Sequence, residues 1–104
     1  MQRVAFKMKM KPGMKAEYMK RHNEVWPEIV ELIRKSGISD YSIFLDEETN
    51  ILFGVQKVSG NVGSQDLGFN EIQKKWWDYM ADIMDTNPDH SPVTIFLDEV
   101  FHLD

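Results

Sequence analysis

One histidine of the sequence lies within a helical stripe of apolar side chains. Hydrophobic residues recur at three- and four-residue steps over residues 14–33. On a helical wheel that starts at Met14, Tyr18 falls at about 40° and His22 at about 80°, inside this stripe. An imidazole titrates near neutral pH and is costly to bury without a partner. Two interpretations are therefore open: a core histidine with one hydrogen-bond partner, or an acid–base group in a pocket.

A second group of candidate residues is aromatic. Trp76 belongs to the apolar stripe of a predicted helix and Trp77 falls at its flank, so we expect one ring inside and the other at an edge. Core and rim packing explains such a pair by default. The alternative is a sugar platform, in which an aromatic ring covers the C–H face of a pyranose and the indole N–H binds a hydroxyl. Tyr41 opens a predicted strand, where a phenol can hydrogen-bond a ligand.

Several other kinds of site lack support in the sequence. The chain has no cysteine, which excludes disulfides, thiol nucleophiles and thiolate metal sites. Its three histidines, His22, His90 and His102, are not at metal-ligand spacing, and no phosphate-binding loop or GxSxG elbow is present. The net charge of −5 argues against nucleic acid as a partner, because phosphate binding needs a basic surface. We therefore expect neither a metal nor a cofactor.

The elements that must position these residues follow the order β-α-β-β-α-β. They are a strand at 3–11, a helix from 14 to about 35, strands at 41–46 and 51–58, a helix from about 70, and a last strand at about 93–103. Pro27 should kink or restart the first helix, since it lacks an amide donor. Asn70 followed by Gln73 resembles a capping box at the start of the second helix. At 104 residues, the chain should form a single domain, 1–104.

This order of elements favours an α+β fold with a four-stranded antiparallel sheet and both helices on one face. The other face then carries apolar residues such as Phe44, which two sheets packed together in a homodimer would bury. Lys7 and Lys9 count against this dimer, because they should point toward the same face; they lie at its rim or pair with Asp98. The N-terminus lacks the apolar core of a signal peptide and no stretch is long enough to span a bilayer, so we expect a cytoplasmic protein.

Six segments together carry a resemblance to a known family. They are "EYMKRHNEVWPE", "DYSIFLD", "LFG", "WWDYM", "NPDHSPV" and "EVFHL", and they occur in the family's order over nearly the whole chain. With them the sequence resembles the L-rhamnose mutarotase family. The resemblance implies a dimeric, ferredoxin-like α/β barrel and a cofactor-free isomerase that interconverts the α and β anomers of L-rhamnose. It also implies that His22 is the proton donor and that Tyr18, Tyr41, Trp76 and Trp77 bind the sugar.

Two features depart from the family pattern. Residues 59–69, "SGNVGSQDLGF", are glycine-rich where members tend to continue into a charged, helix-forming stretch. This departure predicts a late start of the second helix or a mobile loop before it. His90 stands where members usually have asparagine. If the glycine-rich segment borders the pocket, the accepted sugar could differ from L-rhamnose.

The candidate residues suit anomer exchange, although other functions stay open. Ring opening needs an acid that protonates the ring oxygen and a base that removes the anomeric proton, and a histidine with an ordinary pKa of about 6.5 suits such work. The second group is either Tyr18 or a bound water. One alternative is a cofactor-free monooxygenase of the same fold, with Trp76, Trp77, Phe6 and Met8 around an aromatic substrate. Another is a sugar-binding module without catalysis.

Overall fold

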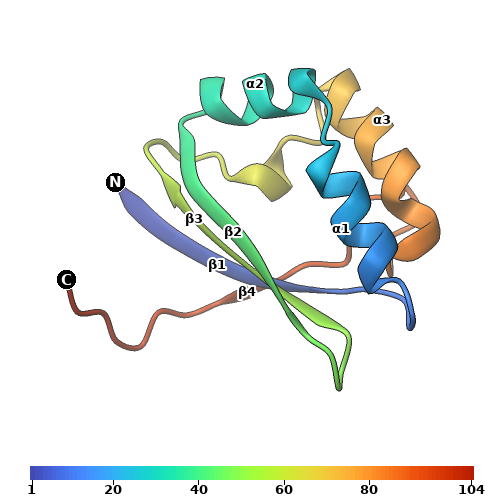
Figure 1. Ribbon diagram of the computed structural model, residues 1–104. Helices are drawn as coiled ribbons and strands as arrows, with labels where there is room; N and C mark the ends of the chain where they lie inside the picture. The colour runs from blue at the N-terminus through green and yellow to red at the C-terminus, as the bar shows by residue number, and fades with distance from the viewer.

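The chain folds into one sheet with helices on one side of it. The computed structural model describes residues 1–104, with β1 (Gln2–Lys9), α1 (Lys15–Asn23), α2 (Pro27–Lys35), β2 (Ile38–Asp46), β3 (Ile51–Val58), the 3-10 turn η1 (Ser64–Asp66), α3 (Glu71–Met80), the 3-10 turn η2 (Ala81–Ile83) and β4 (Ile95–Leu97). The four strands are antiparallel in the order β2-β3-β1-β4. Figure 1 shows all three α-helices over the same face. This arrangement confirms the predicted α+β fold.

The first helical region is divided as its proline predicts. α1 ends at Asn23, and Pro27 occupies the first position of α2 after an extended Trp26 with ψ of 133°. Proline is tolerated there because the first amides of a helix have no partner within the helix. The break lets α1 and α2 run in different directions above the sheet (Figure 1). Gly37, with φ of +84°, follows the end of α2 in the left-handed conformation that suits glycine.

An irregularity in β2 decides which side chains of that strand face the helices. Ser39 pairs with Lys57 and Ser42 with Val55, so two residues, Asp40 and Tyr41, oppose the single residue Gln56. Asp40 takes a positive φ of 48° at this point. Such a β-bulge shifts the in–out alternation by one residue. Tyr41 and the residues that follow it therefore point to the face of the sheet opposite to the one expected from regular alternation along the strand.

The hydrophobic core lies between the sheet and the helices. Its fully buried members come from β1, β3 and the segment around α3, and include Phe6, Met10, Leu52, Leu67 and Ile83. On the opposite face of the sheet, the register places Lys7 beside Phe53, which in turn lies beside Phe44. Lys7 and Phe44 therefore share the open face, as the sequence predicts. None of the helices has the length and apolar character needed to cross a bilayer.

The last strand is much shorter than the sequence predicts. β4 covers only Ile95–Leu97, and residues 98–104 form no regular structure. Figure 1 shows this segment leading away from the body of the fold. Val100 and Phe101 are 94% and 79% exposed, and no ion pair joins Lys7 to Asp98. The prediction of a strand over 93–103 was wrong because apolar alternation makes a strand only where a neighbouring strand completes its hydrogen bonds.

Candidate active site

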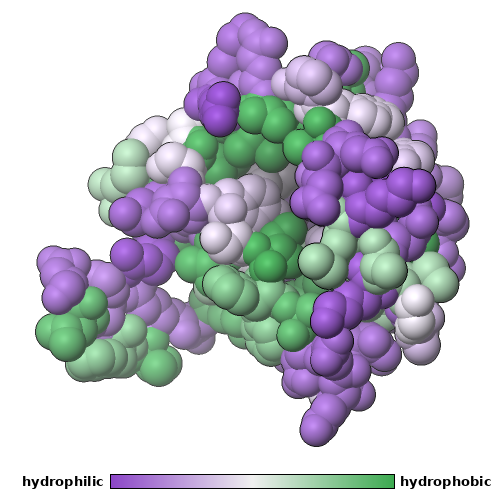
Figure 2. Space-filling model, in the orientation of Figure 1, coloured by the Kyte–Doolittle hydropathy of each residue, from purple (hydrophilic) through white to green (hydrophobic).

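A cavity lies between the helices and the covered face of the sheet. Its volume is about 650 Å³, within the range of small-molecule pockets. Side chains from α1, α2, α3, β1, β2 and η1 line it, and most of them are apolar. Figure 2 shows a hollow on this side of the molecule with hydrophobic side chains gathered around it. The cavity is large enough for one pyranose ring and is open to solvent on one side.

His22 reaches this cavity from the last turn of α1. Its Nδ1 lies 3.1 Å from the carbonyl oxygen of Tyr18, one helical turn earlier. Because a carbonyl oxygen can only accept, Nδ1 must carry the hydrogen of this bond. Nε2 makes no hydrogen bond to the protein, so in the neutral ring its lone pair is left for a ligand. The histidine thus has the single partner of a core residue and a second nitrogen available for chemistry.

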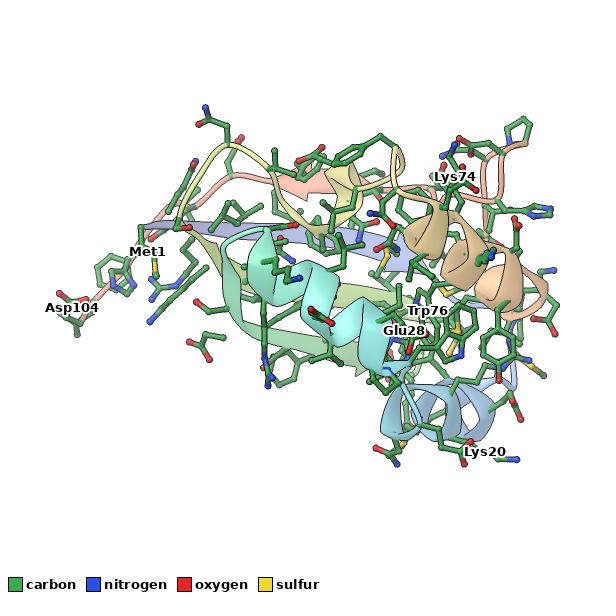
Figure 3. The ribbon with its side chains drawn as sticks, turned by 90° about the horizontal axis from the view of Figure 1, so that it is seen from above. Met1, Lys20, Glu28, Lys74, Trp76 and Asp104 are labelled. Carbon is green, nitrogen blue, oxygen red and sulfur yellow. The ribbon has the colours of Figure 1, made fainter.

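Aromatic contacts hold the His22 ring in one orientation. The Tyr18 ring stacks on it with a centroid distance of 4.3 Å. Trp76 of α3 meets it edge-on at 5.6 Å, with the ring planes 86° apart. Figure 3 shows Trp76 in the region where the helices converge. Since both neighbours are rigid, the position of Nε2 is defined before any ligand enters.

Burial shifts the titratable groups of the cavity in opposite directions. It lowers the pKa of the His22 imidazole, because the charged form loses hydration, and the bond to the Tyr18 carbonyl offsets this only in part. Burial raises the pKa of the Tyr18 phenol, and the nearby Tyr41 raises it further. Burial also raises the pKa of Tyr41, against a smaller opposing effect of Ser64 and Gln65. At neutral pH the cavity therefore contains a neutral imidazole and two protonated phenols.

Both tryptophans of the pair on α3 are buried. Trp76 is 6% exposed and Trp77 is 8% exposed, and both line the cavity. The prediction that Trp77 lies at an edge was therefore wrong. A Cβ atom on Gly68 would lie 2.9 Å from Cζ3 of Trp77, so the glycine lets its backbone pack directly on the indole. The glycine-rich segment covers Trp77, which the periodicity of the helix alone does not reveal.

The glycine-rich segment also forms part of the cavity wall. Ser64 and Gln65, in η1, line the cavity near Tyr41. Gln56 of β3 holds Ser64 in place: its Nε2 donates to the hydroxyl at 2.8 Å, and its Oε1 accepts from the backbone amide at 2.9 Å. α3 begins at Glu71, after η1 and a turn, which agrees with the predicted late start.

A profile of L-rhamnose mutarotase sequences matches residues 3–103 of the chain. The chain belongs to the L-rhamnose mutarotase family. It is 64% identical to an L-rhamnose mutarotase of Bacteroides thetaiotaomicron and 61% identical to one of Formosa agariphila, in both cases over the full length of both chains. Its structure also resembles the crystal structure of L-rhamnose mutarotase FA22100 from Formosa agariphila, with a TM-score of 0.94, 57% identity and full coverage of both chains.

Family membership agrees with the resemblance stated from the sequence and gives no support to a monooxygenase. The five predicted site residues, Tyr18, His22, Tyr41, Trp76 and Trp77, all line the one cavity. They come from three elements that are far apart in the chain, α1, β2 and α3. Their roles toward a sugar remain predictions.

The structure adds residues to the site that the sequence analysis missed. Trp26 meets Trp76 edge-on at 5.2 Å and stacks on Tyr79 at 5.7 Å, so it supports the ring that contacts His22. Its place directly before Pro27, at the helix break, was the available clue. Gln73 lines the cavity with a buried side chain. The sequence had assigned Gln73 to a capping box, which hid it as a site residue.

Arg21 joins α1 to the end of α3 beside the site. Its guanidinium donates to the Asp82 carboxylate at 2.7 Å, to the Tyr79 carbonyl at 2.7 Å, and to Glu17 at 2.8 Å. It also lies 4.6 Å from the centroid of the Tyr79 ring. These contacts tie the turn of α1 that carries His22 to the helix that carries Trp76. The i, i+4 spacing of Glu17 and Arg21 was the only sign of this in the sequence.

The remaining histidines lie outside the cavity. His90 is exposed and its Nδ1 lies 2.8 Å from Asp78, while His102 is in the C-terminal segment. No group of three or more histidine and carboxylate side chains is placed to hold a metal ion.

Proposed function

We propose that this protein interconverts the α and β anomers of L-rhamnopyranose, with no cofactor, in the cavity between the helices and the sheet. The proposal rests on one observation above all: a neutral imidazole presents a free Nε2 to a cavity of sugar size. Membership of the L-rhamnose mutarotase family supports the choice of reaction and of sugar. The aldose 1-epimerase type of isomerase requires only proton transfers, which the residues of this cavity are able to perform.

The first chemical step transfers two protons at the anomeric centre. His22 Nε2 accepts the proton of the anomeric hydroxyl while a donor supplies a proton to the ring oxygen. The bond between C1 and the ring oxygen breaks, its electron pair remains on the ring oxygen, and the anomeric oxygen becomes an aldehyde. A neutral histidine suits the first role and a protonated phenol or a bound water suits the second.

Ring closure reverses these transfers on the other face of the aldehyde. Rotation about the bond between C1 and C2 exposes that face to the ring-forming hydroxyl. The imidazolium of His22 then returns its proton to the oxygen at C1, which is the proton-donor role implied by the family resemblance. Microscopic reversibility thus requires His22 to act as base in one direction and acid in the other, so its pKa must lie within reach of working pH.

The aromatic residues are proposed to hold the sugar during this exchange. The indole faces of Trp76 and Trp77 offer apolar area for the C–H bonds of the pyranose. The Tyr18 phenol has no hydrogen-bond partner in the protein and the Tyr41 phenol interacts with Ser64 and Gln65, so each can still bond a sugar hydroxyl. Positioning by rigid rings lowers the entropic cost of reaching the reactive geometry.

The decisive experiment is saturation-transfer NMR on equilibrated L-rhamnose. One anomeric proton is irradiated and the other is observed with wild-type protein, His22→Ala and His90→Ala. We expect transfer with wild type and with His90→Ala, whose ring lies outside the cavity, and a loss of at least about 100-fold with His22→Ala. His22→Ala should still bind the sugar, because Tyr18 and the tryptophans remain.

Other outcomes would contradict parts of the proposal. Transfer by wild type that survives in His22→Ala would remove His22 from the chemistry. Sugar binding by wild type without any transfer would favour the non-catalytic sugar-binding module. If L-rhamnose neither binds nor exchanges but another aldose does, the substrate would be wrong and the reaction right; the glycine-rich wall around Ser64 would be the first place to look for the reason.

We also propose a homodimer, formed through the open face of the sheet. Phe44 is 62% exposed and Ile95 is 54% exposed on this face, and Phe101 of the C-terminal segment is 79% exposed. Burial of such side chains against a second copy is favourable. Analytical ultracentrifugation should give the mass of two chains; a monomer at micromolar concentration would contradict the proposal. The predictions of a cytoplasmic location and of no nucleic acid partner stay predictions.

A further inference from the structure

We propose that Gln73 is a specificity-determining residue: its side-chain amide binds a hydroxyl group of the sugar in the cavity. The inference rests on the proposed function and deepens it, because it adds a polar contact that neither the motifs nor the resemblance identified. The ligand class that it requires is a pyranose with a free hydroxyl group directed toward α3.

Gln73 is buried without a partner. Its side chain is 5% exposed and lines the cavity, yet it makes no hydrogen bond to any protein atom. Every side-chain nitrogen or oxygen that is completely enclosed in this protein does have a partner. The Gln73 amide is therefore not completely enclosed, and the cavity that this side chain lines is open space beside it. An amide that is largely withdrawn from water and has no partner in the protein costs free energy, so a ligand or water should complete its bonding.

The second buried glutamine shows how a structural amide looks in the same fold. Gln56 is 1% exposed, and both ends of its amide are bonded to Ser64. Gln56 thus fixes η1 against the sheet. Gln73 has the same side chain and is similarly buried, but its amide makes no such bonds. A structural role like that of Gln56 therefore does not explain why a polar residue occupies this buried position.

The helix start does not use Gln73 either. A capping box would require its side chain to bond the backbone amide of Asn70. That amide instead donates to the carbonyl of Leu67 at 3.0 Å. Asn70 alone caps the helix, through its Oδ1 and the amide of Ile72 at 2.9 Å. The predicted capping box was therefore half wrong, and the amide of Gln73 is left for another purpose.

The position of Gln73 matches the proposed sugar platform. Residues three and four apart lie on one face of a helix, so Gln73 shares its face with Trp76 and Trp77. Trp76 in turn contacts His22. A primary amide offers donors and an acceptor, which complement a hydroxyl that both donates and accepts. Gln65, another cavity amide, already bonds Ser64 and Thr94, and Asn23 is exposed at the surface, so Gln73 is the buried cavity amide with both ends unoccupied.

A substitution with similar volume separates this role from a packing role. Gln73→Met retains the shape and removes the amide, and it breaks no protein hydrogen bond. Gln56→Met is the matched control, because it removes the same group where both ends are used. Each variant is compared with wild type on L-rhamnose and on its 2-, 3- and 4-deoxy analogues. Exchange is measured by saturation transfer, binding by quenching of tryptophan fluorescence, and folding by thermal unfolding without sugar.

We expect wild type to discriminate against one deoxy analogue by roughly five- to ten-fold, because that sugar leaves the Gln73 amide unpaired. Gln73→Met should lose this discrimination. Its exchange rate and affinity for L-rhamnose should fall to those for that analogue, and the values for the analogue itself should change little. The Tm of Gln73→Met should stay at or above that of wild type. Gln56→Met should lower Tm by about 4–8 °C, since it loses structural hydrogen bonds.

Three results would overturn the inference. Equal losses on all sugars would show a packing role, and an unchanged affinity for L-rhamnose would show that the amide binds only water. A fall in Tm of Gln73→Met as large as that of Gln56→Met would show a structural role. The proposed function fails separately: if wild type binds the sugars without exchange, the fluorescence titrations still test Gln73, and if it binds none of them, both proposals are overturned.

Discussion

On the covered face of the sheet, His22, Tyr18 and Tyr41 lie in an apolar cavity, whereas on the opposite face Phe44 is exposed. Polar groups are thus partly withdrawn from water on one side and apolar groups are exposed on the other. Either arrangement is costly for an isolated chain. Both costs disappear if a ligand occupies the first face and a second copy covers the other. The two faces therefore point to two different occupants, which the following variants distinguish.

The largest effect should come from Tyr18→Phe, which tests the covered face. The substitution removes the phenol but keeps the ring that stacks on His22 at 4.3 Å. If Tyr18 is the proton partner of His22, anomeric exchange should fall by about 100-fold. Tm should change little, because no protein hydrogen bond of the hydroxyl is lost. Saturation-transfer NMR and thermal unfolding measure the two quantities, and an exchange rate within about three-fold of wild type would leave a bound water as the second group.

A charge on the open face should weaken the dimer and leave the cavity unaffected. Phe44→Asp places a carboxylate in the proposed interface, and we expect the dimer dissociation constant to rise by at least about ten-fold. Analytical ultracentrifugation over a range of concentrations measures this change. Phe69→Asp is the matched control, because Phe69 is 72% exposed on the glycine-rich segment and lies outside the sheet. Equal effects of both substitutions would argue against a specific interface.

A smaller effect is expected from the ion pairs that support the covered face. Arg21→Met removes the contacts with Asp82, Glu17 and the Tyr79 carbonyl. Because the Asp82 carboxylate is largely exposed and screened by water, the loss should be about 1 kcal/mol of unfolding free energy. Urea denaturation measures it.

The exposed pair between Lys35 and Glu31 supplies the control for Arg21. Lys35→Met removes a charge from the surface of α2, away from the cavity, and should have no measurable effect on stability or exchange. An equal loss in both variants would mean that Arg21 has no special role in joining α1 to α3.

The pH dependence should be the smallest of these effects. Burial lowers the pKa of His22, so between its ordinary value of about 6.5 and its lower value in the folded protein, the unfolded chain binds a proton that the folded protein does not. Stability should therefore fall as pH decreases through this window, and His22 should contribute nothing above it. The acidic limb of kcat/KM should likewise have its inflection below pH 6.5, since the neutral form is the base. An inflection above this value would contradict a desolvated His22.

The sequence predicted the local parts of this site well. The placement of Tyr18 and His22 on one helical face follows from a spacing of four residues, and the bond between the His22 ring and the Tyr18 carbonyl lies within that same turn. The break at Pro27 follows from the chemistry of one residue. The resemblance supplied the family, which the profile match and the structural comparison support over the full chain.

Errors arose where a residue's surroundings come from distant parts of the chain. Trp77 is buried because Gly68 packs on it, and helical periodicity carries no information about that contact. The strand predicted beyond Leu97 has the right alternation but no neighbouring strand to bond. In both cases the local pattern was read correctly. For Trp77, the segment that packs on it was not foreseen, and for the last strand, the neighbouring strand that it would need is missing.

The sequence by itself determined the order of the elements, the helix break and the face of α1 that carries His22, because these depend on residues within a few positions of one another. Only the tertiary structure decided that Tyr41 turns toward the cavity, through a bulge opposite Gln56, and that Gln73 lines the cavity without a hydrogen bond to the protein. Strand register and the choice among competing hydrogen-bond partners are set by contacts between segments far apart in the chain. Those contacts have no signature in the spacing of the residues themselves.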